Sequence, residues 1–166
     1  MDLVTVSTTI GRPREEVFDY LADIANHLEF SDHYMKDFRL TRLDSYGRGA
    51  GARFRLDAPL HDLWADMTFA EVEPPYRIVA FGRGGKFNRI KTTTIYTLDD
   101  AGGGDSTRVE VMSESEPPLP TDKLLEKISG YRGWTRRSLR KSLQRLQAIL
   151  EENEDRGPRA TVAGVQ

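Results

Sequence analysis

Three side chains in this sequence are candidates for a catalytic acid or base. Tyr96 lies in a run of alternating residues and Tyr131 in a run with helical spacing, so both are expected to point inward. A buried phenol needs a hydrogen-bond partner, which can be a core group or the polar end of a bound molecule. His33 follows Asp32, whose carboxylate can orient the ring, and an imidazole titrates near neutral pH. A satisfied core tyrosine and a surface histidine remain the alternative interpretations.

The sequence has no pattern typical of a metal centre or a catalytic cysteine. It contains three histidines, none paired with another at a helical zinc spacing, and no cysteine. The lack of cysteine excludes disulfides and thiolate chemistry and fits a reducing compartment, so a cytoplasmic location is expected. The glycine-rich segment 82–86 lacks the Lys-Ser/Thr ending of a phosphate-binding loop and predicts a hairpin turn. We expect neither a metal nor a cofactor.

The charge balance argues against a general affinity for nucleic acid. Lys and Arg number 24 and Asp and Glu 26, a net charge of −2, so DNA is not an expected partner. A local exception is the ridge of Arg132, Arg136 and Arg140, which can contact an anionic membrane surface, a phosphate-bearing ligand or RNA, or can simply be a solvated helix face. No segment approaches the roughly 20 apolar residues of a membrane span, and no export signal is expected. The oligomeric state is left open.

Hydrophobic periodicity predicts the elements that must position these side chains. β-Branched residues alternate over 4–10 and predict a strand, and Pro13 then begins an amphipathic helix. Alternating segments between turn residues predict six further strands, at 36–43, 51–57, 63–72, 77–82, 88–98 and 107–115. The sequence therefore predicts a seven-stranded antiparallel sheet.

The C-terminal third predicts one long helix and a tail. Thr121 can cap a helix whose apolar positions recur at intervals of three and four as far as Leu150, a length of about 30 residues or roughly 45 Å. Residues 153–166 are polar with Gly and Pro and are expected to be disordered. The predicted organisation is a domain at 1–152 and a tail at 153–166.

These elements predict an α+β fold with an internal cavity. A seven-stranded sheet curls, and a single helix laid across its concave face cannot fill the concavity unless side chains close it. The inward positions of strands and helix give a mostly apolar lining with a few hydroxyls, and a core that is filled by these side chains is the less favoured alternative. The expected ligand-binding residues are Phe54, Leu56, Met67, Phe69, Thr94, Tyr96, Val111, Leu124, Ile128 and Tyr131.

Four sequence segments carry a family resemblance. They are residues 10–27 (IGRPREEVFDYLADIANH), 49–54 (GAGARF), 71–78 (EVEPPYRI) and 104–109 (GDSTRV). With this order of elements, the chain resembles the START-related helix-grip (SRPBCC) superfamily, in its polyketide cyclase/dehydratase-like branch. The resemblance implies a helix-grip fold, in which two short helices and a long C-terminal helix accompany a curved seven-stranded sheet. It names no reaction, because such proteins include carriers, cyclases, lipid-transfer domains and quinone-binding proteins.

Three functions are consistent with the sequence. The leading hypothesis is the binding or transport of an apolar small molecule, such as a lipid, a polyketide or an isoprenoid-like compound. The second is an enzyme of the cyclase or dehydratase type that uses Tyr96, Tyr131 or His33 as its acid or base. The third is an oligomeric or RNA-associated regulator that acts through the basic C-terminal helix.

Overall fold

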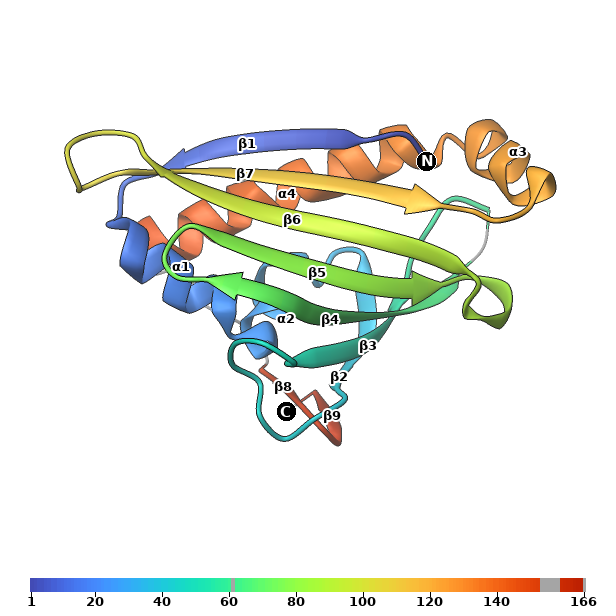
Figure 1. Ribbon diagram of the computed structural model, residues 1–166, viewed down its shortest axis with the longest axis horizontal. Coiled ribbons are helices and arrows are strands. Elements are labelled where there is room, and N and C mark those ends of the chain that lie inside the picture. Colours follow the sequence, from blue (N-terminus) through green and yellow to red (C-terminus); the bar gives the residue numbers. More distant parts are fainter. Residues whose placement is uncertain (61, 153–158, 166) are drawn as a thin grey trace.

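The computed structural model describes residues 1–60, 62–152 and 159–165, and in it a curved sheet is crossed on its concave face by one long helix (Figure 1). The sheet has seven strands in the order β1-β7-β6-β5-β4-β3-β2, and every neighbouring pair is antiparallel. The helix-grip fold predicted from the sequence is confirmed. The strands are β1 Val4–Ile10, β2 Met35–Leu40, β3 Gly51–Leu56, β4 Leu63–Glu73, β5 Arg77–Gly84, β6 Ile90–Asp100 and β7 Thr107–Glu116.

Three short helices connect β1 to β2 and cover one end of the concave face. They are α1 Arg14–Ala22, the 3-10 helix η1 Ile24–Asn26 and α2 His27–Ser31. Pro13 precedes the first residue of α1, where its fixed backbone angle suits a helix start. The Asp23 carboxylate accepts a hydrogen bond of 3.1 Å from the backbone N–H of Ala25 and so begins η1. Both features were readable in the sequence.

The single C-terminal helix predicted from the sequence is wrong in one respect, because it is two helices. They are α3 Pro120–Ile128 and α4 Tyr131–Glu152. Gly130 between them has φ +68°, a left-handed conformation that ends helices and that glycine adopts without steric cost. The apolar periodicity runs on through Gly130 without revealing the break. In consequence α3 points away from the axis of α4 (Figure 1).

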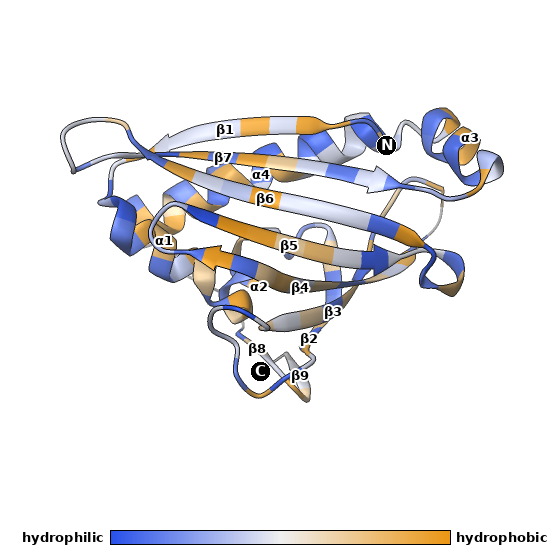
Figure 2. Ribbon diagram, viewed as in Figure 1, coloured by the Kyte–Doolittle hydropathy of each residue, from blue (hydrophilic) through white to orange (hydrophobic). Residues whose placement is uncertain are grey.

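The alternation of side chains along each strand decides which residues meet under α4. On β1, Val4 and Val6 are buried and Thr5 is exposed, and Figure 2 shows this alternation of hydropathy along the strand. Thr94 of β6 pairs with Ala80 of β5 and Ser113 of β7, while Tyr96 pairs with Ile78 and Val111. The face of α4 that covers them is largely aliphatic. Its buried aliphatic residues are Leu139, Leu143, Leu146, Ile149 and Leu150.

The predicted disordered tail differs from the structure over its last residues. Residues 153–158 and 166 lie outside the described residues, but β8 Ala160–Thr161 and β9 Gly164–Val165 form a short hairpin. Ala160 is buried in the hydrophobic core, and Arg159 forms a 2.8 Å ion pair with Asp23. Two-residue strands are too short to show alternation, so only tertiary contacts reveal them. In the described part of the chain, no helix is both long and apolar enough to cross a membrane.

Candidate functional site

Small side chains on the inner face of the sheet leave a hollow beneath α4. Ala65 of β4 and Ala80 and Gly82 of β5 lie where larger residues would reach the helix. A Cβ at Gly82 would come within 2.3 Å of the Asp66 carbonyl oxygen, so the close approach of β4 to β5 requires glycine there. The resulting inner cavity has a volume of about 80 Å³. The cavity wall is mostly apolar and also contains the hydroxyls of Thr92, Thr94 and Ser113.

Six of the ten ligand-binding residues expected from the sequence line the inner cavity. Phe69 and Val111 are instead packed into the solid core, and Leu124 and Ile128 are exposed by 57% and 69%. The last two were assigned on the assumption of one continuous helix, whereas the break at Gly130 turns α3 outward. The six that line the inner cavity are Phe54, Leu56, Met67, Thr94, Tyr96 and Tyr131.

Three phenols gather in the inner cavity: Tyr34, Tyr96 and Tyr131. Burial raises the pKa of all three; the Glu126 carboxylate and then the Tyr34 phenol raise the pKa of Tyr131 further, and the Tyr34 phenol raises that of Tyr96. The Tyr34 hydroxyl interacts with Ser31 and Ser142. Among the described residues, neither the Tyr96 nor the Tyr131 hydroxyl has a hydrogen-bond partner, and neither is among the fully buried polar atoms that lack one, so both keep accessible surface in the cavity. Two protonated phenols in an apolar cavity thus retain their capacity for a hydrogen bond.

Aromatic contacts fix the orientation of these phenols. The Trp134 ring packs edge-on against Tyr34 at 5.8 Å between centroids and lies 5.2 Å from Tyr131. The ring of Tyr96 packs edge-on against His27 at 5.6 Å. Tyr34 and Trp134 were not among the predicted lining residues. The spacing of three between Tyr131 and Trp134 was a usable signal, since such pairs share a helix face.

An outer pocket of about 200 Å³ adjoins the inner cavity. The two share Leu56, Ala65, Thr92 and Tyr131 as lining residues, so one wall continues into the other. The outer pocket is covered by α3, by the loop between β3 and β4, and by the turn between β5 and β6. A molecule in the inner cavity can therefore extend toward α3.

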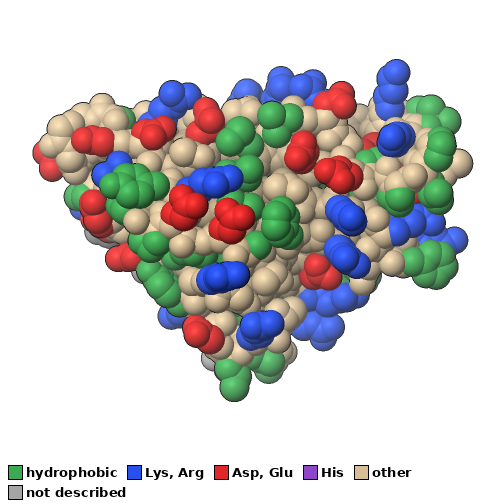
Figure 3. Space-filling model, in the orientation of Figure 1, with side chains coloured by type: hydrophobic (Ala, Val, Ile, Leu, Met, Phe, Trp, Pro, Cys, Tyr) green, Lys and Arg blue, Asp and Glu red, His purple; other side chains and the backbone are tan. Residues whose placement is uncertain are grey.

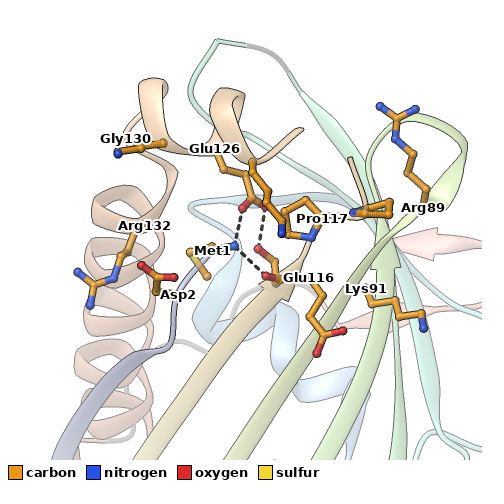
Figure 4. Close-up of a pocket in the computed structure, with 13 residues that line it drawn as sticks. Met1, Asp2, Arg89, Lys91, Glu116, Pro117, Glu126, Gly130 and Arg132 are labelled. Atoms are coloured by element: carbon orange, nitrogen blue, oxygen red, sulfur yellow. Dashed lines mark hydrogen bonds and ion pairs between the residues drawn. The ribbon is translucent and has the colours of Figure 1, made fainter. Parts of the chain in front are cut away.

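A wider cleft of about 940 Å³ lies on the other side of α3 and is drawn in Figure 4. The α-amino group of Met1 donates to the Ser115 carbonyl at 2.7 Å and to a Glu126 carboxylate oxygen at 2.5 Å. The other Glu126 oxygen accepts from the Ser115 hydroxyl at 2.7 Å. Eight of the thirteen residues that line this cleft are charged, so it suits a purely apolar ligand less well than the inner cavity does.

Neither described histidine is placed to move a proton in the inner cavity. His33 contacts Tyr34 but does not line the cavity, and its Nε2 lies 3.1 Å from the Ser138 carbonyl oxygen. Burial lowers the pKa of His27 to about 4, and its Nε2 donates to the Leu21 carbonyl at 2.8 Å. His27 is therefore neutral near pH 7 and acts as a packed ring. The third histidine, His61, lies outside the described residues.

Comparison with known families decides where the chain belongs. A family model described as "Polyketide cyclase / dehydrase and lipid transport" matches residues 1–151. The chain is a member of this family. The START-related helix-grip superfamily and its polyketide cyclase/dehydratase-like branch, inferred from the sequence, are confirmed by this match. No curated protein matches the chain.

Several solved structures share this fold. TTHA0849 from Thermus thermophilus aligns with a TM-score of 0.69 at 15% identity, over 93% of this chain and all of that one. A START superfamily protein from Mycobacterium smegmatis aligns with a TM-score of 0.64 at 14% identity, over 91% and 98% of the two chains. Norcoclaurine synthase from Thalictrum flavum gives 0.68 at 11% identity, over 93% and 88%. At such identities the likeness shows the fold alone, a fold that supports a ligand-binding cavity.

The arginine ridge of this family member lies away from the inner cavity. Arg132, Arg136 and Arg140 are all exposed on α4. Arg132 donates a hydrogen bond of 3.4 Å to the Leu3 carbonyl, and Arg140 borders a shallow groove beside β1 and β7. Contact of this ridge with RNA, a membrane or a second chain stays a prediction.

Proposed function

We propose that this protein binds an apolar small molecule that carries one oxygen-bearing group, and that the hydroxyls of Tyr96 and Tyr131 bind that group. The observation that carries the proposal is a pair of phenols, Tyr96 buried and Tyr131 partly buried, that face a mostly apolar cavity and have no hydrogen-bond partner among the described residues. A buried hydroxyl left without a hydrogen bond costs free energy, which a bound ligand with a matching oxygen recovers. A lipid, a polyketide and an isoprenoid-like compound all meet this description.

The sizes of the two spaces limit how the ligand lies. The inner cavity, at about 80 Å³, accepts only the oxygen-bearing end of a lipid-sized molecule. The remainder extends into the adjoining outer pocket beneath α3. If about 300 Å² of apolar surface is buried, the hydrophobic effect contributes on the order of 7 kcal/mol. After the entropic cost of binding is subtracted, the expected affinity is micromolar or weaker.

A likeness in fold supports the chemical class of the ligand. The solved norcoclaurine synthase is in complex with dopamine and hydroxybenzaldehyde. Both are small ring compounds that carry oxygen. The phenols of Tyr96 and Tyr131 face a cavity in this fold and suit a group of that kind.

The protonation states favour binding over proton transfer. A general base works best with a pKa near the pH of the reaction. Burial moves the pKa of Tyr96 and Tyr131 upward and that of His27 downward, away from neutrality in each case. Catalysis of a cyclase type remains the second candidate because a protonated phenol can donate to a carbonyl oxygen and stabilise negative charge that develops on it.

The test identifies the bound molecule and then removes the hydroxyls. Native mass spectrometry of the purified protein, followed by solvent extraction, is expected to release an apolar compound containing oxygen. Tyr96→Phe and Tyr131→Phe are expected to weaken its rebinding by roughly fivefold each, the value of one hydrogen bond of about 1 kcal/mol. Tyr76→Phe is the matched control, because Tyr76 is exposed far from the inner cavity.

The outcomes separate the two candidates. Rebinding without chemical change supports a carrier, whereas conversion of the extracted molecule supports an enzyme. Loss of conversion in Tyr96→Phe with rebinding retained assigns catalysis to the phenol, and His33→Ala is expected to change neither property. Equal weakening by Tyr76→Phe contradicts the proposed binding mode.

A further inference from the structure

Exposed apolar side chains gather at the end of the molecule that covers the outer pocket. We call this region the α3 end and define it as Leu60, the 3-10 helix η2 (Lys86–Asn88) and α3. Phe87 is 84% exposed, Leu60 74%, and Leu124, Leu125 and Ile128 of α3 are exposed as well. Leu60, Lys86 and Leu125 line the same outer pocket, which brings the three segments together. Figure 3 shows hydrophobic and Lys or Arg side chains side by side at the right-hand end, over α3 and the β5–β6 turn.

The backbone holds two of these side chains in unusual conformations. Leu60 has φ +77° and Phe87 φ +60°, the left-handed region that residues other than glycine rarely adopt. An exposed apolar side chain gains nothing from burial that would offset such strain. Strained segments of this kind are concentrated at binding and switch regions.

The cations of the α3 end are not neutralised by local carboxylates. Lys86, Lys123 and Lys127 of the α3 end and the adjacent Lys91 of β6 are exposed, and within the described ranges none has an ion-pair partner. The acids of α3, in contrast, are engaged. Asp122 receives two hydrogen bonds, of 2.6 and 2.8 Å, from Arg89, and Glu126 binds the Met1 amine and Ser115. Glu116 and Asp2 are the other acids near the cleft.

The cations diverge, which indicates the geometry of their partner. Around the cleft that borders α3, Figure 4 shows the side chains of Lys91 of β6, Arg132 of α4 and Arg89, which is paired with Asp122, pointing in different directions, away from Glu126. A single phosphate needs converging donors, whereas a surface of many headgroups is contacted by cations spread over an area. The arrangement therefore fits an extended anionic surface.

We propose that the α3 end docks on a bilayer that contains anionic lipids. Leu60, Phe87 and the apolar face of α3 enter the boundary between headgroups and acyl chains, and the surrounding lysines contact the headgroups. The ridge of Arg136 and Arg140 on α4 lacks this combination, because its exposed neighbours are polar. Docking goes beyond the proposed function and stands on surface observations alone, although it would bring the outer pocket to face the bilayer.

The experiment is flotation of the full chain with vesicles of phosphatidylcholine alone, and with vesicles in which roughly a third of the lipid is phosphatidylglycerol. Binding to the anionic vesicles is expected at low ionic strength, with weakening in salt of about 0.5 M. Phe87→Ser combined with Ile128→Ser, and separately Lys123→Gln combined with Lys127→Gln, are each expected to weaken binding about tenfold. The control for the apolar pair is Leu43→Ser, because Leu43 of the β2–β3 loop is 91% exposed. The control for the lysine pair is Arg136→Gln combined with Arg140→Gln, two exposed cations of α4.

The proposal is overturned if the protein floats with neither kind of vesicle, or if the control pair on α4 weakens binding as much as the lysine pair. It is also overturned if sedimentation without vesicles shows a dimer that Phe87→Ser with Ile128→Ser dissociates, since the patch is then covered by a second copy. A separate measurement keeps the two proposals distinct: p-cresol, a small apolar ring with one hydroxyl, serves as the probe of the inner cavity, and its binding is measured without vesicles. Vesicle binding without p-cresol binding overturns the proposed function alone, and the reverse outcome overturns docking alone.

Discussion

The two ends of the concave sheet face differ in what fills them. At the end beside α1, large side chains such as Ile10, Ile78 and Leu98 are fully buried and the core is solid. Toward α3, the same strands carry Ala80, Gly82 and hydroxyl-bearing residues, and the interior is hollow. One continuous sheet thus provides both a packed core and a cavity. The difference arises from side-chain size at matched positions of neighbouring strands.

The largest expected effect compares two phenylalanines. Phe69 is fully buried and its ring lies 5.4 Å from that of His27, so Phe69→Ala is expected to lower the free energy of unfolding by about 4 kcal/mol. Phe87, exposed at the α3 end, is expected to change it by less than about 0.5 kcal/mol when replaced by alanine. Urea denaturation measures both. Similar losses for the two variants would contradict the division into a packed and an open end.

The buried His27 predicts a pH dependence of stability that originates in the packed end. Burial lowers its pKa in the folded protein from 6.5 to about 4, so between these values the unfolded chain binds a proton that the native state does not. Stability is therefore expected to fall by about 3 kcal/mol as pH decreases from about 6.5 to about 4. In His27→Gln this slope should largely vanish, leaving the contribution of His33, whose pKa burial also lowers. An unchanged slope in that variant would assign the effect elsewhere.

A pair of small-to-large substitutions probes the space directly. Ala22 is fully buried at the end of α1, and Ala22→Val is expected to cost about 1–3 kcal/mol through overpacking. Ala80 lines the inner cavity, where added methyl groups enter empty space, so Ala80→Val is expected to cost less than about 1 kcal/mol while weakening ligand binding. Thermal denaturation and ligand titration on both variants make the comparison. An Ala80→Val cost equal to that of Ala22→Val would indicate a solid interior.

The smallest effects concern the junction of α3 and α4. Gly130 has φ +68°, so Gly130→Ala is expected to cost about 1 kcal/mol. Gly133 lies within α4 with open space around its missing Cβ, and Gly133→Ala is expected to stabilise by about 0.5–1 kcal/mol. Opposite signs in denaturation confirm the helix break. Stabilisation by both variants would support one continuous helix.

The sequence predicts the sheet well and the α3 end poorly, because the signals for strands are local and unambiguous whereas the signal for the helix break is not. Strand alternation and turn residues are local, so all seven strands and five of the residues that line the inner cavity followed from them, namely Phe54, Leu56, Met67, Thr94 and Tyr96. The conformation of Gly130 is also local but ambiguous, since a glycine within a periodic run either continues or ends a helix. That ambiguity misplaced Leu124 and Ile128. Whether the hydroxyls of Tyr96 and Tyr131 find a hydrogen-bond partner depends on contacts across the fold, which periodicity cannot resolve.

The comparison of p-cresol with toluene tests the central claim most directly. The two probes have similar apolar surface but differ in one hydroxyl, and equilibrium dialysis measures their affinities for the native protein and for Tyr96→Phe with Tyr131→Phe. The double variant is expected to bind p-cresol about 25-fold more weakly, the product of the two fivefold effects, and toluene with unchanged affinity, because only the phenolic oxygen contacts the two hydroxyls. If neither probe binds, the claim of a hollow interior is contradicted. If toluene loses as much affinity as p-cresol in the double variant, the claim that the two phenol hydroxyls bind the oxygen of the ligand is contradicted.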